Sequence, residues 1–205
     1  PVDPEPLRAA APGAVVIIED CAHAFPAAIL PPNAPERPAG TLGETTCFSF
    51  YATKNVTTGD GGMLVLGDAA MEDRARSLLL HGMSADAWNR YHGAGARYQI
   101  LEAGYKYNLP DPLAAIGRVQ LAKIGLLQAK REALWRRYSD EFSCVNGITP
   151  PADPPGIRHA RHIYALRVRP GAPAPDRADM RDKLAERLAA DGIATSVHFG
   201  ALHRE

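Results

Sequence analysis

The sequence predicts an α/β or α+β fold, because segments typical of buried strands alternate along the chain with segments of helical periodicity. The clearest strand is 14–19, a short run rich in β-branched apolar residues, as in the strands of parallel sheets. The clearest helix starts near Asp111, which can cap it, and Pro112, which suits a first turn. Apolar residues then recur at helical spacing as far as Cys144, with Gly125 as a point where the helix could bend or split.

The remaining elements follow from shorter patterns. The stretch 26–43 is rich in proline and glycine, so we expect an irregular surface segment there. Residues 45–51 alternate aromatic and small side chains like a strand, and the glycines of 59–62 require a turn before a further strand at 63–66. The patterns after residue 66 predict a helix at 69–80 with Asp68 as its N-cap and His81-Gly82 as its end, a proline-rich linker at 150–156, a strand at 163–168, a helix at 176–190 closed by Gly192, and a strand at 195–199.

Composition and charge exclude several classes of protein. The 205 residues carry 23 Lys and Arg against 23 Asp and Glu, and 46% are hydrophobic, which is typical of a globular protein with an ordinary core. Arg131, Arg136 and Arg137 are assigned to the solvent face of the long helix. A net charge of zero gives no field that attracts nucleic acid or an anionic membrane, and no apolar run is long enough to span a bilayer. We therefore expect neither nucleic acid nor a membrane as a partner.

The cysteines and the first residues bear on the cellular compartment. Cys21, Cys47 and Cys144 are odd in number and irregularly spaced, so we expect a reducing cytoplasm and no disulfide framework. The chain begins with Pro1 instead of Met, and residues 1–6 lack the basic and apolar regions of a signal peptide. We therefore interpret the sequence as a fragment of a cytoplasmic protein.

The segment 17–62 carries the chemistry. An acid-bearing strand end, IIEDCAHAF, precedes a strand that runs into the loop FSFYATKNVTTGDGG, and strand ends of parallel sheets are where α/β proteins gather ligand groups. A pyridoxal phosphate site needs a lysine for the Schiff base, a carboxylate to keep the pyridinium nitrogen protonated, and donors for the phosphate. Lys54, Asp20 and Ser49 supply these three groups.

These motifs resemble a known family. The sequences EDCAHA, GTLGETTCFSFYATKNVTTGDGG and GYKYNLPDPLAAIGRVQL, within 17–62 and 104–121, resemble the DegT/DnrJ/EryC1/StrS-type sugar aminotransferases, which are fold-type-I pyridoxal phosphate enzymes. HARHIYALRV and TSVHFGALH also resemble this family, especially its members that aminate a 4-keto pentose on a UDP carrier. The resemblance implies a partial, mostly parallel sheet from a large cofactor domain (1–125) and an incomplete small α+β C-terminal domain (126–205).

The resemblance also assigns roles residue by residue. It implies that Lys54 is the Schiff-base lysine and proton shuttle, that Asp20 pairs with the pyridinium nitrogen, and that His23 approaches the cofactor's 3-hydroxyl. It implies that Ser49 binds the phosphate in the same chain, whereas Asn108 reaches the phosphate in the neighbouring subunit of a homodimer. The implied reaction converts a nucleotide-linked keto sugar into an amino sugar, with glutamate as the amino donor.

Substrate recognition has weaker signals. Lys106, His162 and His198 could meet a nucleotide diphosphate or the donor's carboxylate, since cations suit both, although single residues of this kind are more often structural. Residues 81–91 resemble a family loop near the substrate entrance, but their composition equally predicts a helix end with surface packing. The tail at 195–203 favours a 4-keto sugar on UDP, and amination at C3 of a dTDP sugar is the alternative.

The chain departs from the family in two respects. Pro26 stands where the family usually has glycine, and the proline-rich run up to Gly40 looks like an insertion at the rim of the site. The family's N-terminal half, with its phosphate-binding turn and the residue that stacks on the cofactor ring, has no counterpart here, so we expect weak cofactor binding or none from the chain alone. A truncated module for folding or dimerisation is therefore the non-catalytic alternative, and the joint presence of the site residues named above argues against it.

Other chemistries have less support. Some relatives are pyridoxamine-phosphate-dependent dehydratases, in which histidine replaces the lysine. Because this chain has Lys54 at that position, the sequence argues against a dehydratase. Cys21, His23 and Cys47 do not have the spacing of the usual metal ligands and lack an evident fourth ligand, so no metal site is expected. The glycines at 93–95 have no preceding strand, which argues against a dinucleotide-binding turn.

Overall fold

The computed structural model describes residues 1–205 except 12, 14, 85–98, 169–173 and 200–205, and it describes the backbone alone at 174, 175 and 177. The chain forms two compact units, one made of Pro1–Arg131 with Asp153–His162 and the other of Glu132–Ala152 with Ile163–Glu205. The segment 153–162 thus returns to the first unit, whereas the sequence predicts a single domain boundary after residue 125. That boundary stays a prediction.

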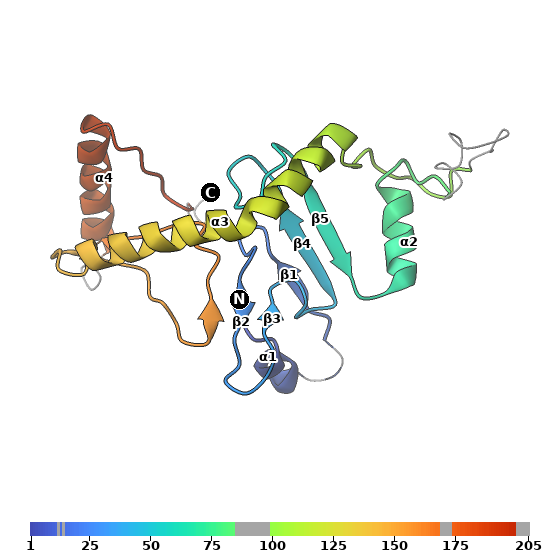
Figure 1. Ribbon diagram of the computed structural model, residues 1–205, viewed down its shortest axis with the longest axis horizontal. Coiled ribbons are helices and arrows are strands. Elements are labelled where there is room, and N and C mark those ends of the chain that lie inside the picture. Colours follow the sequence, from blue (N-terminus) through green and yellow to red (C-terminus); the bar gives the residue numbers. More distant parts are fainter. Residues whose placement is uncertain (12, 14, 85–98, 169–173, 200–205) are drawn as a thin grey trace. The chain divides into compact units, whose positions relative to one another are not determined.

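The main sheet of the first unit has three strands in the order β1-β4-β5 (Figure 1). β1 (Ile18–Asp20) runs parallel to β4 (Thr45–Ser49), and β4 runs antiparallel to β5 (Gly62–Leu66). Gly62 permits the close pairing at the end of β4, since a Cβ there would lie 2.6 Å from the carbonyl oxygen of Phe48. A mixed sheet with helices gives the α/β class expected from the sequence.

β1 is shorter than the strand predicted at 14–19. Its partner begins only at Thr45, because the chain turns at Gly43 just before it. Ile17 therefore has no ladder partner on β4, and its N–H donates instead to the side chain of Glu44 at 2.7 Å. The β-branched pattern identified the strand, but the length of the neighbouring strand set its limits.

The proline-rich stretch 26–43 is more ordered than predicted. It contains β2 (Ala28–Ile29) and β3 (Arg37–Pro38), which form a second sheet with β7 (Ile157–Arg158) in the order β3-β2-β7. Pro38 lies on an edge strand of this sheet, where a residue without an N–H is tolerated. Ala27, Ala28 and Ala39 are buried, so the expectation of a wholly irregular surface segment was wrong.

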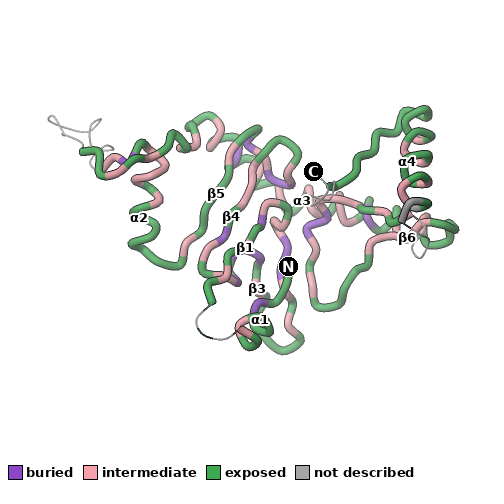
Figure 2. Tube along the Cα trace, turned by 180° about the vertical axis from the view of Figure 1, so that it is seen from behind, coloured by how far each residue is buried: buried purple, intermediate pink, exposed green. Residues whose placement is uncertain are grey.

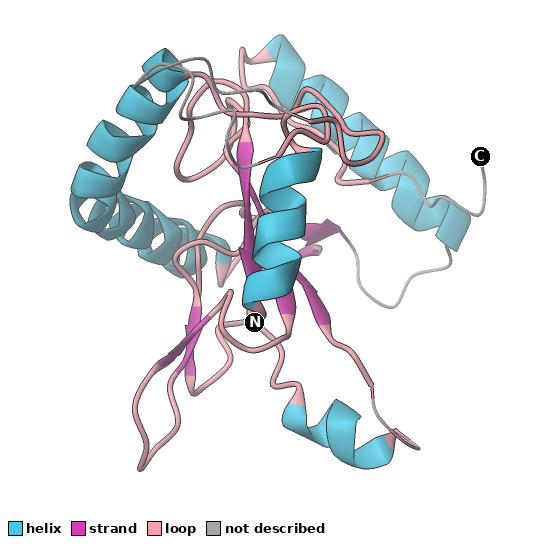
Figure 3. Cartoon of the chain, turned by 90° about the vertical axis from the view of Figure 1, so that its right-hand side faces the viewer, coloured by secondary structure: helices cyan, strands magenta, loops and turns pink. Residues whose placement is uncertain are grey.

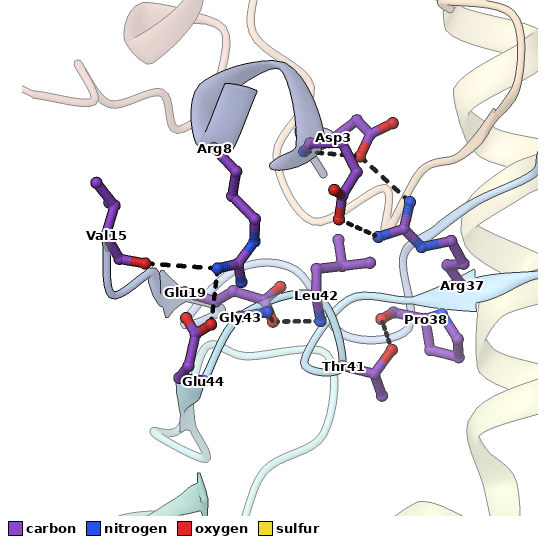
Figure 4. Close-up of polar contacts among 11 residues, drawn as sticks. Asp3, Arg8, Val15, Glu19, Arg37, Pro38, Thr41, Leu42, Gly43 and Glu44 are labelled. Atoms are coloured by element: carbon purple, nitrogen blue, oxygen red, sulfur yellow. Dashed lines mark hydrogen bonds and ion pairs between the residues drawn. The ribbon is translucent and has the colours of Figure 1, made fainter. Parts of the chain in front are cut away.

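A carboxylate fastens the turn before β4. Glu19 of β1 accepts hydrogen bonds from the N–H groups of Gly40, Leu42 and Gly43 and from the hydroxyl of Thr46, at 2.8–3.1 Å. Figure 4 shows Glu19 beside Leu42 and Gly43. Four donors on one carboxylate tie the Pro-rich segment to the start of β4. These bonds therefore hold residues 40–43 and the start of β4 against β1.

Helices of the first unit follow the local signals closely. α1 spans Glu5–Ala10, and α2 spans Ala69–Leu78 with the side chain of Asp68 accepting from the N–H of Met71 at 2.9 Å, as the predicted N-cap requires. Beyond α2, His81 and Gly82 have left-handed φ angles of 62° and 68°, which confirms the predicted helix end. Figure 1 shows α2 beside β5.

α3 (Asp111–Phe142) is a single helix of 32 residues to which both units contribute. Gly125 does not interrupt it, since one glycine costs only about 1 kcal/mol in a helix of this length. The helix begins at Asp111 itself, one residue earlier than a capping role for that residue predicts. Its last turn ends two residues before Cys144.

The second unit is built around an aromatic cluster. Trp135 is buried, and its ring meets that of Tyr164 edge-on with centroids 4.7 Å apart, while the Tyr164 hydroxyl lies 3.0 Å from that of Ser139. α4 (Ala174–Ala190) ends at Gly192 with a φ of 78°, as predicted. β6 (Ile148–Thr149) pairs with β8 (Arg167–Val168).

Two predicted C-terminal strands differ from the structure. The strand expected at 163–168 is reduced to β8, because its partner β6 offers only two residues to pair with. No strand forms at 195–199, where every residue is exposed and no neighbouring strand of the described chain is available to satisfy the backbone.

Buried residues gather around β4, β1 and the loops beside them, whereas β5 is mostly exposed (Figure 2). The buried cluster of the first unit consists of small residues, Cys21, Ala27, Ala39 and Ala160, packed with Ala24 and Phe48. Long loops join most of the helices and strands (Figure 3). Among the described helices, none is both long enough and apolar enough to cross a membrane.

Candidate active site

The carboxyl ends of β1 and β4 meet at one edge of the sheet, because these two strands are parallel. Asp20 is the last residue of β1, and Ser49 is the last residue of β4. The N–H of Cys21 donates to the carbonyl of Cys47 at 2.9 Å, so the pairing continues one residue beyond β1. Residues that are 29 positions apart in sequence are thus brought to the same edge, Asp20 from β1 and Ser49 from β4.

Lys54 lies on a loop that is closed at its base. Phe50 donates its N–H to the carbonyl of Gly61 at 2.8 Å and accepts at its own carbonyl from the N–H of Thr58 at 2.9 Å. Within the loop, the N–H of Lys54 donates to the carbonyl of Tyr51 at 2.9 Å, which forms a turn. The loop therefore presents Lys54 next to the end of β4.

A small cavity lies beside the two strand ends. Three of the residues predicted from the sequence line it, namely His23, Ser49 and Lys54. Asp20 is exposed at the end of β1 and directly precedes Cys21, which also lines the cavity. The other lining residues come from the β1 end, the lysine loop and residue 162: Cys21, Ala22, Phe25, Phe50, Asn55, Val56 and His162.

Lys54, Ser49 and Asp20 have hydrogen-bonding capacity left at this edge. In the described part of the chain, the Lys54 amine makes no hydrogen bond or ion pair. Ser49 Oγ accepts from the N–H of Tyr51 at 3.3 Å, which leaves its hydroxyl hydrogen to donate, and Asp20 uses one oxygen to accept from the N–H of Ala22 at 3.0 Å. An amine, a carboxylate, a hydroxyl and an imidazole at one edge form a donor set that fits the aldehyde, ring nitrogen, phosphate and 3-hydroxyl of pyridoxal phosphate.

The surroundings of Cys21 disfavour the ionised form of its thiol. Burial raises the pKa of its thiol to about 11, and the nearby carboxylates of Glu19 and Asp20 add to the increase. The thiol donates a hydrogen bond to Glu19 at 3.8 Å. Cys21, Cys47 and Cys144 are all free thiols, and among the described residues no group of His, Cys, Asp and Glu is placed to hold a metal ion.

Lys106 and Asn108 are not at this edge of the first unit, and His198 belongs to the other unit. Lys106 and Asn108 line a different, broad cavity of about 1410 Å³ in the first unit, where the Lys106 amine donates to Asn108 Oδ1. His198 belongs to the second unit, where it is exposed and its ring centroid is 4.7 Å from that of Phe199. The predicted entrance loop beyond residue 84, the glycines at 93–95 and the end of the 195–203 tail lie outside the described residues.

Asn55 and Arg131 are parts of the site region that the sequence analysis missed. Arg131 was assigned to the solvent face of the long helix, but it is half-buried and its guanidinium donates to the carbonyl of Asn55 at 3.5 Å. Burial lowers the pKa of Arg131. Ile124 and Leu127 precede it at helical spacing and are also half-buried, so its position on the inward stripe was a signal available in the sequence. Arg136 and Arg137 are exposed as predicted and pair with acidic residues of the same helix.

A comparison with models of protein families identifies the family of this chain. The family model described as the DegT/DnrJ/EryC1/StrS aminotransferase family matches residues 5–205. The chain belongs to this family. Both the resemblance drawn from the sequence motifs and the expected fold class are thereby confirmed, and pyridoxal phosphate is the cofactor of the DegT/DnrJ/EryC1/StrS aminotransferases.

Curated relatives match most of this chain but only part of their own length. SpsC of Bacillus subtilis, a spore coat polysaccharide biosynthesis protein, is 40% identical over 188 residues, which are 91% of this chain and 46% of SpsC. A UDP-4-amino-4-deoxy-L-arabinose–oxoglutarate aminotransferase of Shewanella sediminis is 37% identical over 193 residues, which are 93% of this chain and 47% of that enzyme. The chain spans about half the length of the curated relatives it matches.

Solved structures show the same fold. Spr1654 of Streptococcus pneumoniae in its PMP form superposes with a TM-score of 0.76 at 31% identity, covering 91% of this chain and 44% of that one. The same protein has also been solved in its PLP form. This structural neighbour has thus been solved with both the PMP and the PLP form of the cofactor.

Proposed function

We propose that this chain carries the lysine site of a pyridoxal phosphate-dependent aminotransferase that converts a nucleotide-linked keto sugar into an amino sugar. The observation that carries the proposal is the convergence of Lys54, Asp20, Ser49 and His23 at the carboxyl edge of β1 and β4. Family membership supplies the reaction class, and the unpaired amine of Lys54 supplies the group that such a reaction requires.

Each residue at this edge has a chemical task. When bound, pyridoxal phosphate supplies an electron sink for the carbon that loses its proton. The Asp20 carboxylate keeps the ring nitrogen of the cofactor protonated, and the Ser49 hydroxyl donates to the phosphate. Lys54 would hold the cofactor covalently, and its amine would move a proton at the reacting carbon of the substrate. His23 hydrogen-bonds the 3-hydroxyl.

The proposed substrate is a 4-keto sugar on UDP, with glutamate as the amino donor. The Shewanella sediminis relative supports both choices, since its name gives a UDP-linked 4-amino pentose and oxoglutarate, the keto acid of glutamate. Lys106 and His198 are proposed contacts for the diphosphate or the donor carboxylate. If the enzyme turned over only a 3-keto sugar on dTDP and no 4-keto sugar on UDP, the proposed substrate would be wrong.

The proposed assembly is a homodimer with shared sites. Asn108 lines a cavity different from that of Lys54 in the same unit, which supports a role for Asn108 in the site of a neighbouring subunit. A further subunit would also complete the phosphate-binding contacts begun by Ser49.

Covalent capture of the cofactor tests the proposal directly. The protein at its full natural length is incubated with pyridoxal phosphate, reduced with borohydride and mapped by peptide mass, and the adduct is expected on Lys54. Lys54→Ala and Lys54→Arg should lose the adduct and lower the transamination rate about 1000-fold or more, because arginine keeps the charge but cannot bind the cofactor covalently.

Lys123→Ala is the matched control, since Lys123 is an exposed lysine of α3 outside the site. It should label on Lys54 and turn over at the wild-type rate. Capture on another lysine, or normal transamination by Lys54→Ala, would overturn the assignment. Labelling of the 205-residue chain itself would show that the described edge is sufficient to bind the cofactor.

A further inference from the structure

Asn55 links the lysine loop to two distant segments. It follows Lys54 directly and is only 6% exposed. Its side-chain amide nitrogen donates to the carbonyl of Phe25 at 2.9 Å and to the carbonyl of Ala160 at 2.7 Å. Both amide hydrogens are therefore used, on segments that are 30 and 105 residues away in sequence.

These two bonds fix the orientation of the amide. With its nitrogen facing two carbonyls, Asn55 presents Oδ1, which can only accept, to His162 Nδ1 at 3.2 Å. The hydrogen of that contact must therefore sit on Nδ1 of His162. In the neutral ring this leaves Nε2 as an acceptor, and the ring centroid of His162 lies 4.5 Å from that of His23.

We propose that Asn55 is a positioning residue of the lysine site, which anchors the Lys54 loop to the Phe25 and Ala160 carbonyls and holds His162 in its Nδ1–H form beside His23. The inference rests on the proposed function of Lys54 and extends it to a neighbouring group that acts by positioning Lys54 and His162. Arg131 adds a third anchor through the Asn55 carbonyl, so the loop is held from three directions. A reactive amine needs such support, because displacement by about 1 Å can cost 100-fold in rate.

Histidine NMR tests the hydrogen-bond assignment without any cofactor. The protein is labelled with ¹⁵N-histidine, and the His162 signal is identified among the chain's seven histidines by its loss in His162→Asn. We expect the long-range correlation pattern of a ring protonated at Nδ1. A His162 ring protonated only at Nε2 in the wild-type protein would overturn the proposal.

The second measurement is the rate of cofactor capture on Lys54, followed by borohydride trapping over time. Asn55→Asp has the same shape but turns an oxygen toward two carbonyls, so capture should slow by about tenfold or more. Asn33→Ala, at an exposed asparagine of the first unit, should capture at the wild-type rate. Equal rates in Asn55→Asp and wild type would refute the positioning role.

A rescue pair covers the case in which Asn55→Asp does not fold. His162→Leu removes the donor to Asn55 and should slow capture, whereas His162→Asn places an amide N–H near the Nδ1 position and should restore it. Equal capture by these two variants would contradict the proposal. Failure of the wild-type protein to label on Lys54 would instead refute the proposed function, and the His162 spectrum would still decide the role of Asn55.

Discussion

At the scale of single residues, Glu19 is the side chain whose replacement should cost most in the turn before β4. Its carboxylate accepts from three backbone N–H groups and from Thr46. Glu19→Gln puts an amide group against one set of donors, so the free energy of unfolding should fall by about 2 kcal/mol, measured by urea denaturation at neutral pH. Glu44→Gln, which removes an exposed partner of Arg8, should have a much smaller effect.

The same residue sets a pH dependence. Burial raises the pKa of Glu19, but the hydrogen bonds from Gly43, Gly40, Leu42 and Thr46 outweigh it, so the pKa lies below its ordinary value of 4.5. A lowered pKa contributes stability that is complete above the ordinary value and is lost as the pH falls through the folded-state value. The difference in unfolding free energy between wild type and Glu19→Gln should therefore be constant from neutral pH down to about pH 5 and shrink below that. A difference that grows on acidification would contradict the assignment.

At the scale of elements, replacing either of two glycines of α3 by alanine should change the free energy of unfolding by different amounts. A Cβ at Gly117 would lie 2.9 Å from the Cγ2 of Thr58, a buried residue at the base of the lysine loop, whereas a Cβ at Gly125 would meet nothing within 4 Å. Gly125→Ala should therefore raise the unfolding free energy by about 0.5–1 kcal/mol through helix propensity. Gly117→Ala should lose that gain, because Thr58 is β-branched and has little room to move.

Thermal or urea unfolding of the two variants checks this prediction, with each serving as the control for the other. Equal stabilisation by both substitutions would mean that α3 does not press on the lysine loop at Thr58. Slower cofactor capture in Gly117→Ala than in Gly125→Ala would show that the contact between residue 117 and Thr58 also affects the position of Lys54.

At the scale of the whole molecule, the proposed dimer makes a quantitative prediction. In a shared site, Lys54 of one subunit works with Asn108 of the other. Mixing inactive Lys54→Ala with Asn108→Ala subunits gives heterodimers with one intact site each, so activity should return to about a quarter of the wild-type value. The measurement is transamination after co-refolding or co-expression of the two variants.

The two variants assayed separately are the controls, and each should be far below the mixture. A mixture with no more than half the activity of Asn108→Ala alone would place Asn108 in the site of its own subunit. Wild-type activity of Asn108→Ala alone would remove this residue from the site.

Much of the architecture could be predicted from the sequence, because it depends on interactions between residues that are close together along the chain. The N-cap at Asp68, the end of α4 at Gly192 and the alternation in β4 are set by hydrogen bonds and packing within a few residues. The motif around Lys54 singled out that residue and its loop, and the ends of parallel strands were the place where ligand groups were expected. Their roles toward the cofactor stay predictions.

The sequence by itself determined the fold class and the family, and it placed the carboxyl ends of β1 and β4 to within two residues, since periodicity, capping and motif are local properties of the chain. Only the tertiary structure decided that the proline-rich segment is partly buried, that Arg131 faces inward and that Asn55 joins Phe25, Ala160 and His162. The contacts of Asn55 with Phe25, Arg131, Ala160 and His162 join residues 30 to 107 positions apart. Such contacts leave no periodic trace in the sequence, because their partners are brought together by the packing of the sheet and α3 and not by the spacing of residues along the chain.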